Sequence, residues 1–151
     1  IWPELTYLDR PHITHSLEAK FSLQYLVACA LLRKDVTHED FKNERIQESY
    51  LQNIMRKITI SFDKSIPCNF DTFFGEIIIV DIYGKQYKQH CSFHCGHWHN
   101  PATDEQIMNK FISNTQSLFS PSTAKSIGAR FFELDNCGYM QEFWELFTLS
   151  V

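Results

Sequence analysis

The sequence of 151 residues lacks the features that mark several classes of protein. It has no run of about 20 apolar residues, and its most apolar segment, residues 18–32, is interrupted by polar side chains, so we expect no membrane span. Its first residues show no basic region followed by an apolar stretch, so we expect no secretory signal. The 14 basic residues form no stripe or tail and the net charge is −4, which argues against a nucleic-acid partner.

Glycine and cysteine are also scarce, with five residues of each. The sequence contains no glycine-rich phosphate loop and no G-x-S-x-G nucleophile elbow, which argues against those two kinds of site. The number of cysteines is odd, and Cys29 lies in an apolar segment, which disfavours a secreted disulfide scaffold and is typical of a reducing compartment. We therefore expect a cytoplasmic protein, or a mitochondrial one if the source is a eukaryote.

The most informative segment is residues 16–32, which is apolar on nearly all sides and predicts a buried helix. Within it, four polar residues follow a four-then-three spacing and form one stripe along the helix. They are Glu18, Ser22, Tyr25 and Cys29. A buried helix with a single polar stripe is suited to lining a specific site.

The rest of the chain alternates between helical and extended patterns, which predicts an α+β fold. We expect a helical turn at 37–41, a helix at 48–57, strands at 58–63, 74–83 and 87–94, and helices at 103–118, 121–134 and 140–149. Thr103 with Gln106 has the capping-box pattern, and Ser120–Pro121 is a second helix start. The predicted architecture is a small lid-type domain with about three antiparallel or mixed strands packed with helices, followed by C-terminal helices.

Histidine and cysteine, which can bind transition metals, are concentrated in the segment His90–His99. Structural zinc sites usually pair ligands from two separate short motifs, and a strand over residues 90–94 would put its histidines and cysteines on opposite faces. Only His97 and His99 remain as a plausible chelating pair. We therefore expect no metal site, with a small metal-binding protein as the less favoured alternative.

Two blocks of the sequence carry a resemblance to a known family. The first is EAKFSLQYLVACALL at residues 18–32, preceded by DRPHITHSL, and the second is CGHWHNPATDEQIMNKFISNTQSLFS at residues 95–120. The second block contains Gly96, Asn100–Pro101 and Lys110–Phe111. In this order the blocks resemble the C-terminal domain of the MmgE/PrpD family, which includes methylcitrate dehydratases, cis-aconitate decarboxylases and iminodisuccinate epimerases. The resemblance extends from about Asp9 to about Asn136.

The resemblance implies a domain fragment with two parts. Residues 1–119 would form the α+β lid-like domain, and residues 120–151 would be helices that normally pack on a helical domain outside this sequence. It further implies one wall of the active site of a cofactor-independent lyase that acts on a di- or tricarboxylate, 2-methylcitrate dehydratase-like or cis-aconitate decarboxylase-like. We expect a homo-oligomer without nucleic-acid or membrane partners, because apolar residues of the last helices would be exposed. These are Phe131, Phe143, Trp144 and Phe147.

The resemblance also points to individual residues. Tyr25 matches the active-site tyrosine of the family's F-S-x-x-Y motif, so it is the candidate catalytic residue, while Lys20 and Ser22 are candidates for binding an anionic substrate. From the residues alone, Tyr25 could equally be a core tyrosine bonded to a backbone carbonyl, Lys20 a solvated side chain and Ser22 a group bonded to its own helix. His12 and His15 could reach a substrate mouth or lie in solvent.

Because this sequence gives Tyr25 no catalytic base, we expect the isolated chain to be inactive. The competing interpretation is a non-enzymatic, truncated paralogue that acts as a binding or assembly module.

Overall fold

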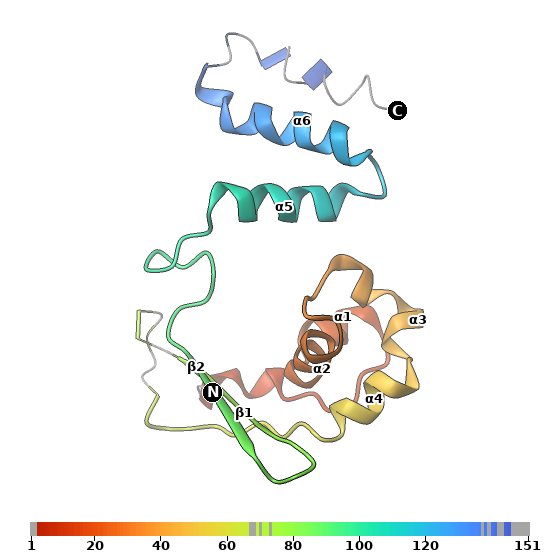
Figure 1. Cartoon of the computed structure of the whole chain (residues 1–151), viewed down its shortest axis with the longest axis vertical. Coiled ribbons are helices and arrows are strands. Elements are labelled where there is room, and N and C mark those ends of the chain that lie inside the picture. Colours follow the sequence, from red (N-terminus) through yellow and green to blue (C-terminus); the bar gives the residue numbers. More distant parts are fainter. Residues whose placement is uncertain are drawn as a thin grey trace. The chain divides into compact units, whose positions relative to one another are not determined.

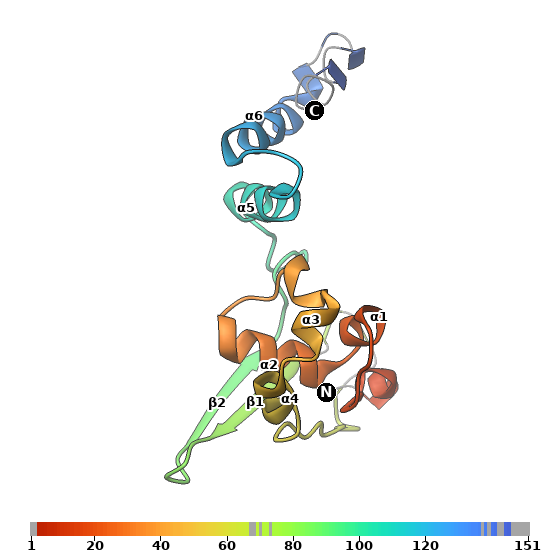
Figure 2. The ribbon, with the colours of Figure 1, turned by 90° about the vertical axis from the view of Figure 1, so that its right-hand side faces the viewer.

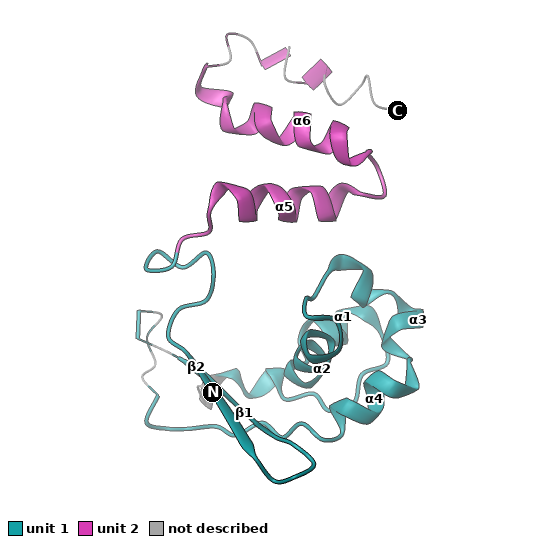
Figure 3. Cartoon of the chain, viewed as in Figure 1, with its two compact units in different colours: residues 1–100 teal, residues 101–151 magenta. Residues whose placement is uncertain are grey.

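The computed structural model describes residues 3–66, 69, 71–72, 74–136, 138, 140–141 and 144–145. The chain divides into two compact units, residues 1–100 and residues 101–151 (Figure 3). Helices occur in both units, and an antiparallel β-hairpin occurs in the first (Figure 1). The predicted α+β fold with C-terminal helices is therefore confirmed.

The helical part of the first unit is built around α2, Leu23–Arg33. Figure 1 shows this helix nearly end-on, with the short helices of the unit around it. These are α1 (Ser16–Lys20), α3 (Asn43–Ile46), α4 (Ser49–Met55) and the 3-10 turns η1 (Pro3–Leu8) and η2 (His38–Phe41). The core forms where α2 meets α4, and its buried residues include Tyr25, Ala28, Cys29, Leu51 and Met55.

The single helix predicted at 16–32 is in fact two helices, α1 and α2, separated at Phe21 and Ser22. Ser22 has extended backbone angles, and its hydroxyl accepts a hydrogen bond from the Tyr25 N–H, so it is the N-cap of α2. Glu18 belongs to α1 and therefore does not continue the predicted polar stripe of α2. The Glu18 carboxylate instead accepts hydrogen bonds from the Thr14 N–H at 2.7 Å and the Thr14 hydroxyl at 2.8 Å. On α2 the polar stripe therefore begins at the N-cap residue, Ser22.

Helix α2 ends at Lys34, whose φ of 64° lies in the left-handed region that favours glycine. We expect Lys34→Gly to raise the free energy of unfolding by about 1 kcal/mol, because glycine has no Cβ to clash there. Urea unfolding measures the change. Lys57→Gly, at an exposed position without positive φ, is the control and should lower the stability. An equal decrease in the free energy of unfolding in Lys34→Gly and Lys57→Gly would contradict the expectation.

The hairpin pairs β1 (Gly75–Val80) with β2 (Gln86–Cys91), with Gly75 opposite Cys91 and Val80 opposite Gln86. Its loop end extends away from the helices of the same unit (Figure 2). Apolar side chains lie on both faces of β1, and Ile77–Val80 are 40 to 58% exposed. Two-stranded sheets are only marginally stable by themselves, so this hairpin has little internal support.

The third predicted strand, at 58–63, is wrong for the described part of the chain, because these residues make no strand pairing. The alternation behind the prediction is nevertheless present in the burial pattern. Ile58, Ile60 and Phe62 are partly buried, whereas the residues between them are exposed. Ile58 packs against the helical core, so the alternation reflects contact with helices rather than a place in a sheet.

The second unit pairs α5 (Asp104–Thr115) with α6 (Pro121–Phe132). Both predicted helix starts are confirmed, since the Thr103 hydroxyl accepts from the Gln106 N–H and the Ser120 hydroxyl from the Thr123 N–H, each at 3.2 Å. The helices approach closely at Gly128, where an added methyl group would lie 2.5 Å from the Met108 Sδ.

The predicted boundary between residues 119 and 120 falls between two helices that pack together, α5 and α6. The compact units divide instead at residues 100 and 101. The lid-like domain at residues 1–119, with helices at 120–151 that pack on a further domain, stays a prediction.

Apolar side chains are exposed near the end of the chain, as expected for Phe131 and Trp144. Phe143, Phe147 and most of the helix predicted at 140–149 lie outside the described residues. Among the helices that are described, none has the length and apolar character needed to cross a membrane.

Candidate functional site

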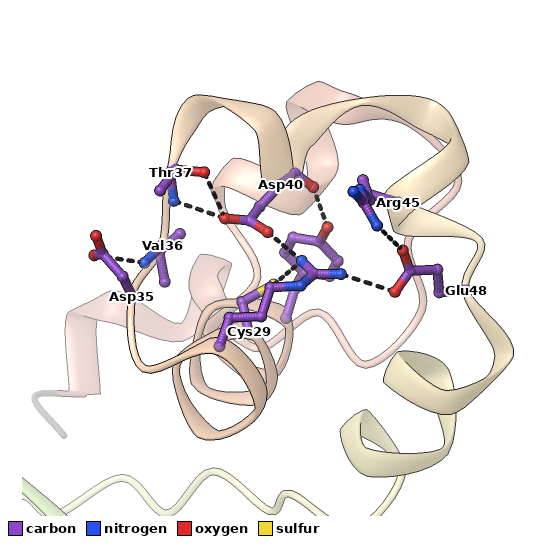
Figure 4. A network of polar contacts seen from close by, with 9 residues as sticks. Cys29, Asp35, Val36, Thr37, Asp40, Arg45 and Glu48 are labelled. Carbon is purple, nitrogen blue, oxygen red and sulfur yellow. Dashed lines mark hydrogen bonds and ion pairs between the residues drawn. The ribbon is translucent and has the colours of Figure 1, made fainter. Parts of the chain in front are cut away.

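Helix α2 presents three chemically active side chains on one face, from its first turn to its last. Tyr25, Cys29 and Arg33 are spaced by four residues, so they follow one another along the helix surface. Figure 4 shows the polar contacts around this face, with Cys29, Thr37 and Asp40 labelled. This cluster, which we call the Tyr25 network, is completed by Asp40 of η2 and Glu48, the residue before α4.

Tyr25 is fully buried, and its hydroxyl donates a hydrogen bond to the backbone carbonyl of Asp40. Its ring lies tilted against that of Phe41, with the centroids 6.1 Å apart. Burial raises the pKa of the phenol far above its usual range, Cys29 and Asp40 add to the rise, and the Arg33 charge opposes it. Tyr25 is therefore a neutral hydrogen-bond donor throughout the physiological range of pH.

Asp40 is held at both its carboxylate and its carbonyl. The carboxylate forms an ion pair with Arg33 and accepts hydrogen bonds from the Thr37 N–H at 2.7 Å and the Thr37 hydroxyl at 3.0 Å. Burial acts to raise the pKa of this carboxyl, but the Thr37 hydrogen bonds and the Arg33 charge outweigh it, so the pKa lies below its usual value. Asp40 is consequently a carboxylate at neutral pH.

Arg33 links three segments of the first unit. One guanidinium nitrogen contacts Asp40 in η2, and the other lies 2.8 Å from Glu48 at the start of α4. Glu48 also accepts from Arg45 at 2.8 Å, so a chain of alternating charges runs from the buried interior to the surface (Figure 4). Two hydrogen-bonding nitrogens in a rigid plane allow arginine to hold two carboxylates at once.

A second set of polar contacts lies at the N-terminal end of α2. The buried Ser22 donates to the Arg10 carbonyl at 2.7 Å, while the buried Gln24 accepts from the Arg10 N–H at 3.1 Å and donates to the Asp9 carboxylate at 2.5 Å. Together these contacts attach the segment around Arg10 to the helix. The candidate substrate-binding Ser22 is thus bonded within the chain, both to this segment and to its own helix.

The other residues predicted for the site are at the surface. Lys20 is exposed, with its ammonium 5.8 Å from the centroid of the Phe41 ring, so Lys20 and Tyr25 both contact the same aromatic side chain. His12 and His15 are exposed as well, and His15 lies 3.6 Å from Glu18. The structure brings Lys20 and Tyr25 near the same ring, that of Phe41, and leaves His12 and His15 exposed.

Sequence reasoning missed Arg33, Asp40 and Glu48. Two signals could have found the first two, because Arg33 continues the spacing of Tyr25 and Cys29, and Thr37 with Asp40 has the spacing of a capping box. No local signal relates Glu48 to the site, since it lies 15 residues from Arg33.

The histidine- and cysteine-rich segment forms a loop after β2, because that strand ends at Cys91. Phe93 stacks on His97 with the centroids 4.8 Å apart, and the rings of His97 and His99 are 5.6 Å apart at 25°. Within the described ranges, no group of three or more His, Cys, Asp or Glu residues is arranged to hold a metal ion. The described rings of this loop pack against one another.

Comparison with known proteins agrees with the resemblance noted in the sequence. The MmgE/PrpD C-terminal domain matches residues 3–133. The cis-aconitate decarboxylases of Mus musculus and Homo sapiens are 26% and 24% identical over 125 residues, which is 83% of this chain but 26% of each relative. The chain thus spans about a quarter of the length of these curated relatives. Because the domain match covers most of its length, the chain belongs to the MmgE/PrpD family.

Proposed function

We propose that the chain contributes one wall of the active site of a cofactor-independent lyase whose substrate is a di- or tricarboxylate. The observation that carries this proposal is the domain match over residues 3–133, together with the similarity to two cis-aconitate decarboxylases. The reaction would begin with removal of a proton next to a carboxylate and continue with loss of CO₂ or water, in a cis-aconitate decarboxylase-like or 2-methylcitrate dehydratase-like enzyme. The remaining catalytic groups would come from residues outside this sequence.

In this proposal Tyr25 supplies the hydroxyl that donates a hydrogen bond at the reacting centre, and Lys20 and Ser22 bind the carboxylates. Lys20 is exposed and its cationic ammonium suits an anionic ligand. In the chain by itself, however, the Tyr25 hydroxyl is bonded to the Asp40 carbonyl and Ser22 to the Arg10 carbonyl. Each must exchange its present partner for a substrate oxygen before it can act.

The isolated chain is therefore expected to be inactive. Purified 151-residue protein should show no turnover of cis-aconitate or 2-methylcitrate, because general base catalysis requires a group in reach of the substrate proton. Turnover by this chain alone would contradict the expectation. An immunoblot of source-cell lysate with an antibody to the chain then gives the size of the native product, which should be clearly larger than 17.8 kDa.

The larger native product is the protein in which Tyr25 is tested. Tyr25→Phe should lower kcat by about 100-fold or more, in the range expected for loss of a catalytic proton donor, while leaving the fold intact. Tyr50→Phe is the matched control, because it removes the hydroxyl of an exposed tyrosine. Equal activity of the two variants would remove Tyr25 from the catalytic groups.

A second function, a non-enzymatic binding or assembly module, is favoured by two other observations. The polar groups of Tyr25 and Ser22 are bonded internally, and the hairpin exposes apolar residues on both faces. An exposed apolar surface of this kind favours self-association. A native product the size of this chain that sediments as an oligomer would support this function, whereas a clean monomer at high concentration would argue against it.

A further inference from the structure

We propose that Arg33 and Asp40 are positioning residues for Tyr25, because their ion pair holds the η2 turn in the place where the Asp40 carbonyl receives the phenol hydroxyl. The inference rests on the proposed function in so far as Tyr25 is an active-site group, and it concerns Tyr25 before substrate binds, while its hydroxyl is bonded to the Asp40 carbonyl. It assigns a task to two residues that neither the family motif nor the sequence pattern singled out.

The attachment of Asp40 determines where the acceptor for Tyr25 lies. Its carboxylate is tied to Arg33 and to both donors of Thr37, while its carbonyl accepts the hydroxyl of Tyr25. Since the carboxylate and the carbonyl belong to the same residue, fixing the first restricts the second. Asp40 therefore transmits the position of the Arg33 guanidinium to the Tyr25 hydroxyl.

The η2 turn needs this external support. It is a 3-10 helix of four residues, His38–Phe41, and such short turns have weak internal hydrogen bonds. Tyr25 and Arg33 both belong to α2, so the ion pair and the hydroxyl connect η2 to a single rigid helix at two points. With two attachments the turn can neither rotate nor slide relative to Tyr25.

The charges of the pair have opposite electrostatic effects on the phenol. Asp40 disfavours ionisation of Tyr25 and Arg33 favours it, as the directions of their effects on the Tyr25 pKa show. Asp40 has 6% and Arg33 27% of its side-chain surface exposed, so solvent screens this pair only in part. The two charges of the intact pair thus oppose each other at the phenol, and loss of either partner leaves the effect of the other unopposed.

The hydroxyl itself can be observed in the full 151-residue chain. Tyrosine is labelled with ¹³C at Cζ, and the ¹³C NMR spectrum is recorded in a mixture of H₂O and D₂O. A tyrosine whose hydroxyl exchanges its hydrogen slowly with solvent gives two Cζ lines, and one whose hydroxyl exchanges fast gives a single averaged line. Tyr25→Phe identifies the Tyr25 signal by its disappearance. We expect two lines in the wild type, because the hydroxyl is buried and bonded to a carbonyl.

Asp40→Asn keeps the backbone carbonyl and the side-chain shape but removes the charge that pairs with Arg33. We expect exchange of the Tyr25 hydroxyl to become about tenfold faster, the change that corresponds to weakening one ordinary hydrogen bond. Arg33→Gln should accelerate it similarly, and the double variant should be no faster than the faster single one, because both substitutions break the same contact. Arg33→Lys, which keeps the charge but loses the planar fork, should lie between wild type and Arg33→Gln.

Glu39→Gln is the matched control, since it removes a carboxylate from the same turn that pairs with Lys42 rather than Arg33. It should leave the exchange rate unchanged. Amide hydrogen exchange in α2, recorded on the same samples, shows whether each variant remains folded. If Asp40→Asn does not fold, the milder variant Arg33→Lys takes its place in the comparison. Equal rates in Asp40→Asn and Glu39→Gln with α2 still protected, or additive effects in the double variant, would overturn the proposal.

The two proposals fail separately. The exchange experiment measures positioning whether or not Tyr25 takes part in catalysis. If Tyr25→Phe leaves the activity of the larger native product intact while Asp40→Asn accelerates exchange, the catalytic proposal fails and the positioning stands as a feature of the fold. If exchange is unaffected while Tyr25→Phe abolishes activity, only the positioning is wrong.

Discussion

Replacement of Tyr25 by alanine is expected to lower the free energy of unfolding of the first unit by about 4 kcal/mol, the usual range for removing a large buried aromatic side chain. Tyr25 ranks first by volume among the fully buried side chains of the described residues. The substitution empties the space between α2 and the η2 turn and also removes the hydroxyl bonded to Asp40. Urea unfolding followed by circular dichroism measures the loss.

Two further variants show how much of this loss comes from volume. Tyr25→Phe keeps the ring and should lose only about 1 to 2 kcal/mol, because the hydrogen bond alone disappears. Tyr50→Ala removes an exposed tyrosine of α4 and should change the stability by no more than about 0.5 kcal/mol. If Tyr25→Ala behaved like Tyr50→Ala, Tyr25 would not be part of the core.

Asp40→Ala is expected to lower the free energy of unfolding by about 3 kcal/mol, because it leaves the Arg33 guanidinium without its buried partner. The effect is at the low end of the range for buried pairs, since Arg33 is partly exposed and keeps its contact with Glu48. Calorimetric or urea unfolding at neutral pH measures it. A change below that of Tyr25→Phe would mean that the ion pair contributes little to the fold.

The same pair gives the stability a defined dependence on pH. The folded pKa of Asp40 lies below its unfolded value, so its contribution is present above the unfolded pKa of about 3.9 and is lost as the pH falls through the lower folded pKa. Glu48 acts in the same direction, because its hydrogen bond from Arg45 and the Arg33 charge lower its pKa despite partial burial. The stability of Asp40→Asn should therefore fall less steeply below about pH 4 than that of the wild type.

The sequence was most informative where a local interaction determines the structure. Helices α5 and α6 each begin at a residue whose side-chain hydroxyl accepts a hydrogen bond from the backbone N–H three residues later. This relation can be recognised within four consecutive residues of the sequence. The hairpin follows from a β-branched run and a turn, and its left-handed loop residue is the glycine at position 84. Such features do not depend on the rest of the fold.

Prediction failed where the competing interactions are distant in sequence. Ser22 interrupts the predicted long helix by bonding to Arg10, twelve residues away, and no periodicity within the segment reveals that partner. The alternation at residues 58–63 predicted a strand, but Ile58 packs against the helical core instead. In the Tyr25 network, Glu48 has no local signal for the same reason, since it lies 15 residues from Arg33, and the contact between Tyr25 and Asp40 spans 15 residues as well.

The close contact between α5 and α6 makes the second unit sensitive to chemical oxidation. The side chain that lies over Gly128 is the thioether of Met108, and an added methyl group at Gly128 would require that side chain to move. Conversion of this sulfur to a sulfoxide would add a polar oxygen to a soft, apolar side chain within the helix contact. Samples exposed to hydrogen peroxide would then contain two populations of the second unit, one with the Met108 thioether over Gly128 and one with the oxidised side chain displaced from it.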